Sequence, residues 1–304
     1  MASIAPAPAY NTAFDAEVGT PVQMARDVVR ITAPNGSPYT FTGTNSFLIG
    51  NESVAIIDPG PVDPVHEAAL LAAVGQRPVT AIILTHTHRD HSAAAAGLAK
   101  AFGAPLWFGG RHRLSRPLRR FERNLIRGSS DWDLVPDRVL TDGETILAGD
   151  RELVVHTTPG HCANHLAFGV AGTDILLSGD HVMGWNSTLV STPDGSMADY
   201  FASLDKVIAL PYRRYFPAHG GPIADGPVYA TALRAHRQMR NRQIIEAVKA
   251  GAKTPLAVVG TIYPKQPPKV RMAALMTITA HIEFLEARGE IVVRRGFLGT
   301  RLAV

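Results

Sequence analysis

The sequence predicts an α+β fold, in which a large domain of mixed strands and helices precedes a small helical domain. Short apolar runs rich in β-branched residues alternate with helix-forming segments up to about residue 226, and the pattern is mostly helical from there on. Hydrophobic residues make up 46% of the 304-residue chain, enough for the cores of two domains. We therefore divide the chain into an N-terminal arm (residues 1–25), a large domain (residues 26–226) and a C-terminal domain (residues 227–304).

The first half of the large domain is predicted to form a hairpin followed by strand and helix units. The arm before it is rich in alanine and proline and is expected to be loose. Residues 41–50 and 52–58 are rich in aromatic and β-branched residues and meet at a polar turn, which predicts a hairpin. Residues 62–75 have the apolar spacing of a helix, whereas residues 79–85 form a continuous apolar run that is typical of a buried strand.

The following segments continue this alternation. Residues 92–103 are strong helix formers, with Ser92 as the expected N-cap and Gly103 as the C-terminal stop. The next strand is predicted at residues 104–110, and a second amphipathic helix at residues 197–210. The remaining strands are expected at residues 138–140, 144–147, 152–158, 165–172, 174–180 and 213–221.

The C-terminal domain has the pattern of a winged helix. Three helices are predicted, at residues 229–251, 254–263 and 270–289. Two short β-like pieces at residues 290–296 and 298–304 close the chain as a hairpin. Three helices and a terminal hairpin within about 80 residues are typical of winged-helix domains.

Charge and composition exclude several classes of protein. The net charge of +4 is too small to indicate a nucleic-acid partner by itself, and a single cysteine, Cys162, rules out an internal disulfide framework. The N-terminus lacks a basic start followed by an apolar stretch, and no apolar run is long enough to span a membrane. We therefore expect a soluble, cytoplasmic protein that does not engage membranes.

Side chains of metal-ligand type crowd the end of the strand at residues 79–85. His86, His88, Asp90 and His91 fall within six positions, between this strand and the following helix. A loop at the end of a strand can turn several side chains toward one point, which strand alternation alone cannot do. Imidazole and carboxylate ligands suit Zn²⁺, with Mn²⁺ or Fe²⁺ as alternatives.

Three further residues of ligand type follow the ends of other predicted strands. His161 comes after the "TTPG" that follows one strand, Asp180 ends "DILLSG", and His219 ends "RRYFPA". Strand ends are the usual place for sites in mixed α and β proteins. We therefore expect these three residues to join the first four in one site.

The ordered set resembles the signature of the metallo-β-lactamase superfamily. Its T-H-x-H-x-D-H motif matches Thr85 to His91, and the later single ligands match His161, Asp180 and His219. The resemblance covers roughly residues 25–225 and implies an αββα sandwich with two metal ions at one edge of two sheets.

The resemblance also implies a role for each ligand. His86, His88 and His161 would hold one metal, Asp90, His91 and His219 would hold the second, and Asp180 would bridge them. Asp58, in the family's Asp-x-Gly position, would support the site without ligating a metal. His165 matches a neighbouring family position and could either support the site or pack within its strand. His181 and Cys162 only adjoin ligands in sequence, and we assign them no role.

A metal pair of this kind implies hydrolysis. Two divalent ions can share a hydroxide at neutral pH and polarise the carbonyl or phosphoryl group under attack. Asp90 is the expected catalytic residue, because its carboxylate could also hydrogen-bond the attacking water. Esters, thioesters, lactones and phosphodiesters all remain candidate substrates, since the same site serves several reactions.

The C-terminal pattern adds a second resemblance, to the winged-helix tail of the β-lactamase-like protein 2 family. "HRQMRNRQI", "TPLAVVGTIYP" and "HIEFLEARGEI" carry it. That family includes ribonucleases that cut single-stranded RNA, so RNA is an alternative partner, as are glyoxalase II-like thioesterases and lactonases for the reaction. The tail could instead shield the core, form a homodimer contact, or act as the reader of a nucleic-acid-binding regulator with a metal-sensing domain.

An arginine-rich segment offers a clue to the charge of a small-molecule substrate. Residues 111–127 hold seven arginines and one acid. Arg113, Arg116 and Arg120 could favour an anionic substrate, because guanidinium groups bind phosphate and carboxylate in bidentate fashion. The alternative is a solvated helix that buries a spaced set of apolar residues. These are Leu114, Leu118, Phe121 and Leu125.

Overall fold

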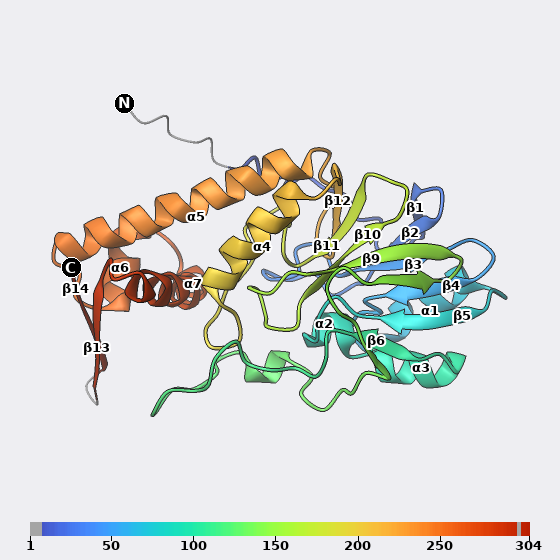
Figure 1. Ribbon diagram of the computed structural model, residues 1–304, viewed down its shortest axis with the longest axis horizontal. Coiled ribbons are helices and arrows are strands. Elements are labelled where there is room, and N and C mark those ends of the chain that lie inside the picture. Colours follow the sequence, from blue (N-terminus) through green and yellow to red (C-terminus); the bar gives the residue numbers. More distant parts are fainter. Residues whose placement is uncertain (1–7, 297–298) are drawn as a thin grey trace.

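The protein consists of two stacked β-sheets with helices on their outer faces, followed by a helical tail (Figure 1). The computed structural model describes residues 8–296 and 299–304. The first seven residues of the predicted arm and residue 298, where the last predicted strand begins, lie outside the described residues.

The first sheet has seven strands in sequence order. They are β1 (Val22–Ala25), β2 (Val28–Thr32), β3 (Asn45–Ile49), β4 (Val54–Ile57), β5 (Val79–Ile83), β6 (Leu106–Phe108) and β7 (Arg138–Val139). The first four strands run antiparallel, so the predicted hairpin forms as β3 and β4. From β4 to β7 the pairing is parallel, and this brings the carboxyl ends of β4 and β5 to one edge.

The second sheet has the order β12-β11-β10-β9-β8. Its strands are β8 (Thr145–Ala148), β9 (Arg151–Thr157), β10 (Leu166–Val170), β11 (Ile175–Gly179) and β12 (Arg214–Pro217). All pairs are antiparallel except β11 with β12, whose parallel pairing places Gly179 beside Pro217. The residues that follow these two strands, Asp180 and His219, therefore emerge at the same edge.

Apolar side chains form the expected αββα layers. One core lies between the sheets, where Phe47 and Ile83 of the first sheet pack with Val155 and Phe168 of the second. Helices α1 (Pro64–Val74) and α3 (Ala95–Phe102) cover the outer face of the first sheet, and the short α2 (Arg89–Ser92) precedes α3. Helix α4 (Met197–Ala209) covers the second sheet. The α+β sandwich predicted from the sequence is confirmed.

The tail begins with a long helix that leaves the sandwich. It consists of α5 (Gly226–Lys249), α6 (Pro255–Ile262), α7 (Pro268–Ala287), β13 (Val292–Gly296) and β14 (Gly299–Ala303). The first half of α5 packs on α4, and its second half joins α6, α7 and the hairpin around a core of its own (Figure 1). Among the described residues, no helix is long and apolar enough to cross a membrane.

Three local predictions were wrong. Ser92 does not cap α3, whose N-cap is Ala94, because Ser92 closes α2 by donating to the carbonyl of His88. Residues 22–25 of the supposedly loose arm pair as β1. Residues 111–127 form turns rather than an amphipathic helix, apart from the short 3₁₀ turn η1 (Arg127–Ser129) that begins at their end. Pro117 interrupts helical hydrogen bonding in the middle of that segment.

A candidate dinuclear metal centre

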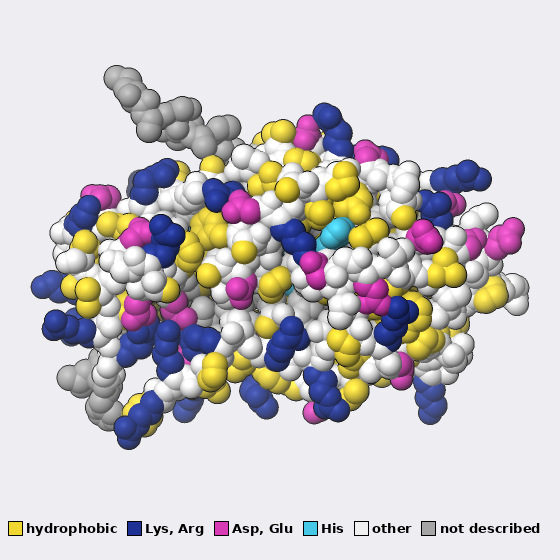
Figure 2. All heavy atoms as spheres, in the orientation of Figure 1, with side chains coloured by type: hydrophobic (Ala, Val, Ile, Leu, Met, Phe, Trp, Pro, Cys, Tyr) yellow, Lys and Arg dark blue, Asp and Glu magenta, His cyan; other side chains and the backbone are white. Residues whose placement is uncertain are grey.

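The two sheets bring the seven predicted ligand residues together at one edge of the sandwich. His86 and His88 follow β5, Asp90 and His91 lie in α2, and His161 follows β9. Asp180 and His219 follow β11 and β12. All except Asp90 are buried, and only a small patch of histidine is visible on the face shown in Figure 2.

The first group is formed by three imidazoles. His86 Nε2 lies 3.0 Å from His88 Nδ1, and His161 Nε2 lies 2.8 Å from the same atom. The opposite nitrogen of each ring faces an oxygen. His88 Nε2 donates to Asp194 (3.0 Å) and His161 Nδ1 donates to the Leu189 carbonyl (2.7 Å). His86 Nδ1 donates to the Thr85 hydroxyl (3.0 Å), because that hydroxyl gives its own proton to Asp58.

The second group is formed by Asp90, His91 and His219. Asp90 Oδ2 lies 3.4 Å from His91 Nε2 and 3.3 Å from His219 Nε2. His91 Nδ1 donates to Asp58 (3.0 Å), and His219 Nδ1 donates to the Gly43 carbonyl (3.1 Å). The Nε2 atoms of both rings therefore point at Asp90, where a cation could take the place of a proton.

Asp180 lies between the two groups. Its Oδ1 is 3.4 Å from His219 Nε2 and 3.7 Å from His91 Nε2, both of the second group. Its Oδ2 is 3.6 Å from His161 Nε2 of the first group. One carboxylate thus faces both groups, in the position where a bridging ligand would lie.

The chemistry of these donors fits divalent cations. Three imidazole lone pairs of the first group face one another within about 3 Å in a buried site, an arrangement that is repulsive unless a cation lies among them. His91 Nε2 and Asp180 Oδ1 are buried and have no hydrogen-bond partner among the described residues. Imidazole and carboxylate donors with a fixed outer hydrogen bond on each ring are what transition-metal sites require.

The two groups differ in electrostatics. Burial, reinforced by His88, lowers the pKa of His161 to about 4, so this ring is neutral at pH 7 and its Nε2 keeps a lone pair for a cation. Burial alone would also lower the pKa of His219, but Asp180 and Asp90 raise it to about 9. The second group is therefore rich in negative charge and attracts a cation.

Asp58 and His165 lie behind the site, in supporting positions. Asp58 Oδ1 accepts the Thr85 N–H (2.7 Å), while its Oδ2 holds both Thr85 and His91. His165 Nε2 accepts the Asp180 N–H (3.0 Å). This approach requires glycine at position 179, since a Cβ there would lie 2.6 Å from His165 Nε2.

Two further residues of the site were not predicted from the sequence. Asp194 accepts from His88 through one oxygen and from His112 Nε2 (2.7 Å) through the other. His112 in turn contacts the Thr87 hydroxyl (2.8 Å), which accepts from the Asn164 amide. These residues come from loops distant in sequence, and no motif marks them.

The predicted substrate arginines have different surroundings. Arg113 donates to the carbonyls of Gly109 and Ala163. Arg116 is engaged by Glu122 and by Glu283 of α7, and Arg120 lies over the ring of Phe121. A substrate-binding role for these three stays a prediction.

His181 and Cys162 point away from the ligand atoms. The Cys162 thiol is buried and donates to Asn164, whereas His181 packs against Tyr200 under α4.

Comparisons with known proteins agree with this architecture. The sequence profile of the metallo-beta-lactamase superfamily matches residues 39–219, and that of the beta-lactamase associated winged helix domain matches residues 254–296. Over 97% of both chains, the fold superimposes on a beta-lactamase domain protein from Burkholderia ambifaria with a TM-score of 0.79 at 23% identity.

Curated relatives share most of the chain. A beta-lactamase-like protein 2 homolog from Caenorhabditis elegans is 28% identical over 85% of this chain and 84% of its own. An atrochrysone carboxyl ACP thioesterase from Aspergillus chevalieri is 26% identical over 82% of this chain and 77% of its own. With its sandwich fold and its matching profile, the chain belongs to the metallo-β-lactamase superfamily of hydrolases and carries that superfamily's winged-helix tail.

Proposed function

We propose that this protein is a dinuclear metal-dependent hydrolase whose substrate is an acyl thioester. One observation supports the metal assignment: seven donor residues converge in two groups, and Asp180 faces both groups. In each histidine, the ring nitrogen that points away from its group is bonded to an oxygen acceptor, which fixes the direction of the ring. Such an arrangement supports two cations side by side.

The donor set favours zinc. Five imidazoles and two carboxylates are available and the only cysteine is turned away, a composition that suits Zn²⁺, with Mn²⁺ or Fe²⁺ as alternatives. A bound pair of such ions supplies an acidified water and a Lewis acid for the carbonyl.

The residues of this chain supply position and proton handling. Asp90 is the most exposed of the seven, with 31% of its side chain accessible, so its carboxylate can accept a hydrogen bond from water at the open side of the site. The Asp180 N–H donates to His165, which fixes the position of the Asp180 carboxylate between the two groups. The thioester assignment is supported by the relatives named acyl carrier protein thioesterases.

Metal analysis followed by a substrate panel tests the proposal. Protein produced with zinc in the medium is expected to contain about two metal ions per chain. It should hydrolyse acyl thioesters faster than lactones, carboxylic esters, β-lactams or single-stranded RNA. A well-folded protein with no metal would exclude the dinuclear site, and faster cleavage of RNA would exclude the thioesterase assignment.

Replacement of Asp180 tests the proposal that its carboxylate bridges two metal ions. Asp180→Ala should lower metal content and reduce hydrolysis by orders of magnitude, because one carboxylate there offsets the repulsion between two cations. Asp133→Ala, at an exposed position, is the matched control. Full metal content and rate in Asp180→Ala would contradict the bridging role.

A further inference from the structure

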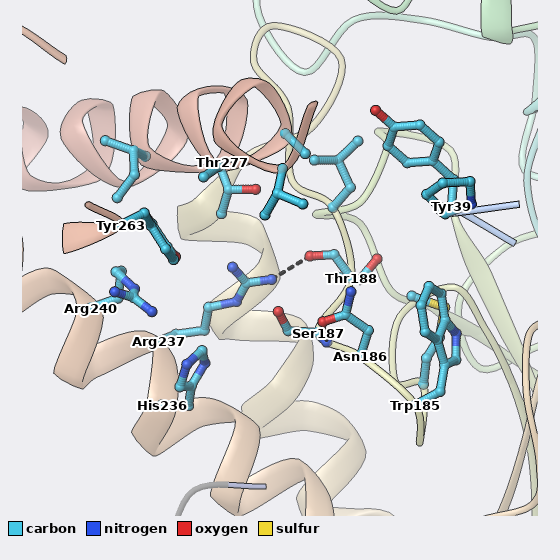
Figure 3. A pocket seen from close by; sticks show the side chains of 17 residues that line it. Tyr39, Trp185, Asn186, Ser187, Thr188, His236, Arg237, Arg240, Tyr263 and Thr277 are labelled. Carbon is cyan, nitrogen blue, oxygen red and sulfur yellow. Dashed lines mark hydrogen bonds between the residues drawn. The ribbon is translucent and has the colours of Figure 1, made fainter. Parts of the chain in front are cut away.

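A cavity lies between the sandwich and the tail, apart from the candidate metal centre. Its volume is about 240 Å³, and its walls come from α5, α7 and the segment that follows β11 (Figure 3). On one side are His236, Arg237 and Arg240 of α5, and on the other are Asn186, Ser187 and Thr188. In Figure 3, Arg237 reaches across the cavity from α5 toward Thr188.

The cavity concentrates positive charge that no carboxylate balances. Arg237 is only 3% exposed, and its Nη2 donates to the Thr188 carbonyl. Its Nε has no partner in the part of the chain that the structure describes. Arg240 lies 4.6 Å over the ring of Tyr263 and donates to Gln243. Within residues 8–296 and 299–304, neither guanidinium forms an ion pair with an acid.

The titratable groups around the two arginines are shifted mainly by burial, and the arginines add to the shift of His236. Burial, followed by Arg237 and Arg240, lowers the pKa of His236 to about 4, so that ring is neutral. Burial also lowers the pKa of the Arg240 guanidinium itself. Buried cations are costly unless they are paired, so an anion bound in this cavity would stabilise the two guanidinium groups.

The cavity is linked to the candidate metal centre by one short stretch of backbone. Thr188 and Leu189 line the cavity, and the Leu189 carbonyl also accepts the proton of His161 Nδ1 at 2.7 Å. The Thr188 hydroxyl lies 3.2 Å from the same nitrogen. An occupant of the cavity therefore lies directly behind a residue that orients a predicted metal ligand.

The remaining walls suit a flexible uncharged arm. Val270, Ala273, Ala274 and Ile278 give an apolar side, and Tyr39 and Trp185 add aromatic surface. Arginine pairs favour phosphate, which they bind through two hydrogen bonds at once. Thioester carriers of the coenzyme A type join the acyl group to a phosphate through such an arm.

We propose that this cavity binds the phosphate of the carrier arm of an acyl thioester, with Arg237 and Arg240 as its counter-charges. The inference rests on the thioesterase function proposed above and adds the part of the substrate that the protein recognises. The small volume of the cavity, about 240 Å³, favours the end of an arm over an extended nucleic-acid strand.

The test compares two thioesters that share an acyl group, one on 4′-phosphopantetheine and one on pantetheine, using the full metal-loaded chain. The wild-type protein should show a KM at least tenfold lower for the phosphorylated substrate. Arg240→Gln should reduce this preference to less than about twofold. Arg242→Gln, an equal charge change at an exposed position of the same helix, should keep it. Arg237→Lys, which retains charge but loses the fork, should give an intermediate value.

Binding of ethyl phosphate, measured by calorimetry on the same proteins, separates this inference from the proposed function. A site present in the wild type and Arg242→Gln but absent from Arg240→Gln supports the phosphate site, even if neither thioester is hydrolysed and the thioesterase function fails. Equal KM values for the two thioesters, together with ethyl phosphate binding that Arg240→Gln does not alter, would overturn the inference. Arg240-dependent binding of a single-stranded RNA oligonucleotide, with no preference between the thioesters, would overturn it in favour of nucleic acid.

Discussion

The direction of every ligand ring is set by an oxygen atom on its far side. His91 is held by Asp58, His88 by Asp194 and His161 by the Leu189 carbonyl. Because an oxygen acceptor fixes which nitrogen carries the proton, it also fixes which lone pair faces the metal position. We therefore expect these acceptors to affect metal affinity as well.

Asp194→Asn is expected to weaken metal binding by about 10- to 100-fold. The carboxylate accepts from His88 and His112 at once, whereas an amide would turn an N–H toward one of the two rings. Competition with a chelator measures the affinity, and Asp133→Asn on an exposed loop is the control. An unchanged affinity in Asp194→Asn would show that His88 does not depend on it.

The sequence predicted the candidate ligand residues and Asp58, but not the other acceptors. His86 to His91 and the three later ligands stand in recognisable motifs at strand ends. Asp194 lies in a loop with no motif, and the carbonyls of Leu189 and Gly43 are backbone groups that any residue could offer. Their roles depend on how distant loops meet, which local pattern does not encode.

The buried side chain of His66 should make the stability of the folded protein depend on pH. Burial lowers its pKa to about 4, and its buried Nδ1 has no partner within the described residues. The unfolded chain takes up this proton near pH 6.5, so the folded state loses stability as the pH falls from about 6.5 toward 4. The loss from this group approaches about 3 kcal/mol, from roughly 1.4 kcal/mol per pKa unit.

Urea unfolding of the wild type and His66→Gln between pH 7.5 and pH 4.5 checks this. Since the metal ligands titrate equally in both proteins, the difference between the two curves isolates His66. The advantage of the wild type should shrink as the pH falls. Parallel curves would show that His66 is not the source.

At the element scale, the arginine-rich segment acts as a tether between domains. Arg116 and Arg119 both pair with Glu283 of α7, and Ser115 bonds the carbonyls of Pro193 and Gly195, which flank Asp194. The sequence showed the charges but not their partner, because Glu283 lies more than 160 residues away. These residues form turns rather than the alternative amphipathic helix, and two of their arginines reach Glu283 from those turns.

Glu283→Gln is expected to lower the free energy of unfolding by about 1–2 kcal/mol, because two partly buried arginines lose their shared carboxylate. Limited proteolysis within residues 111–127 should also become faster. Glu246→Gln, which breaks an exposed pair with Lys249, should change stability by less than about 0.5 kcal/mol. Equal effects of the two substitutions on stability would contradict the proposed role of Glu283 in joining the arginine-rich segment to the tail.

At the scale of the whole molecule, the tail contributes buried side chains to the core on the outer side of the second sheet. Ala230 and Leu233 of α5 and Ala280 of α7 are buried in the same core as Tyr200, Leu204 and Tyr215. The sequence predicted the tail's helices, and the short Pro-containing connection favoured docking over free movement. Figure 2 shows basic and acidic side chains intermixed on the tail, with no single broad basic face in this view.

A chain that ends at residue 226 should therefore lose both stability and metal. Without α5 the apolar face of α4 is exposed, and the segment that carries Leu189 loses its contacts with Arg237 and with the Tyr229 hydroxyl, which donates to Gly184 at 3.0 Å. His161 then loses its fixed orientation, so the three-histidine group should release its metal first. A chain that ends at residue 250 keeps α5 and is the matched comparison, expected to retain more metal and to bind less of a hydrophobic dye. Metal analysis, dye binding and thermal unfolding of the two chains measure this, and a 226-residue chain with two metals and cooperative unfolding would show that the sandwich stands alone.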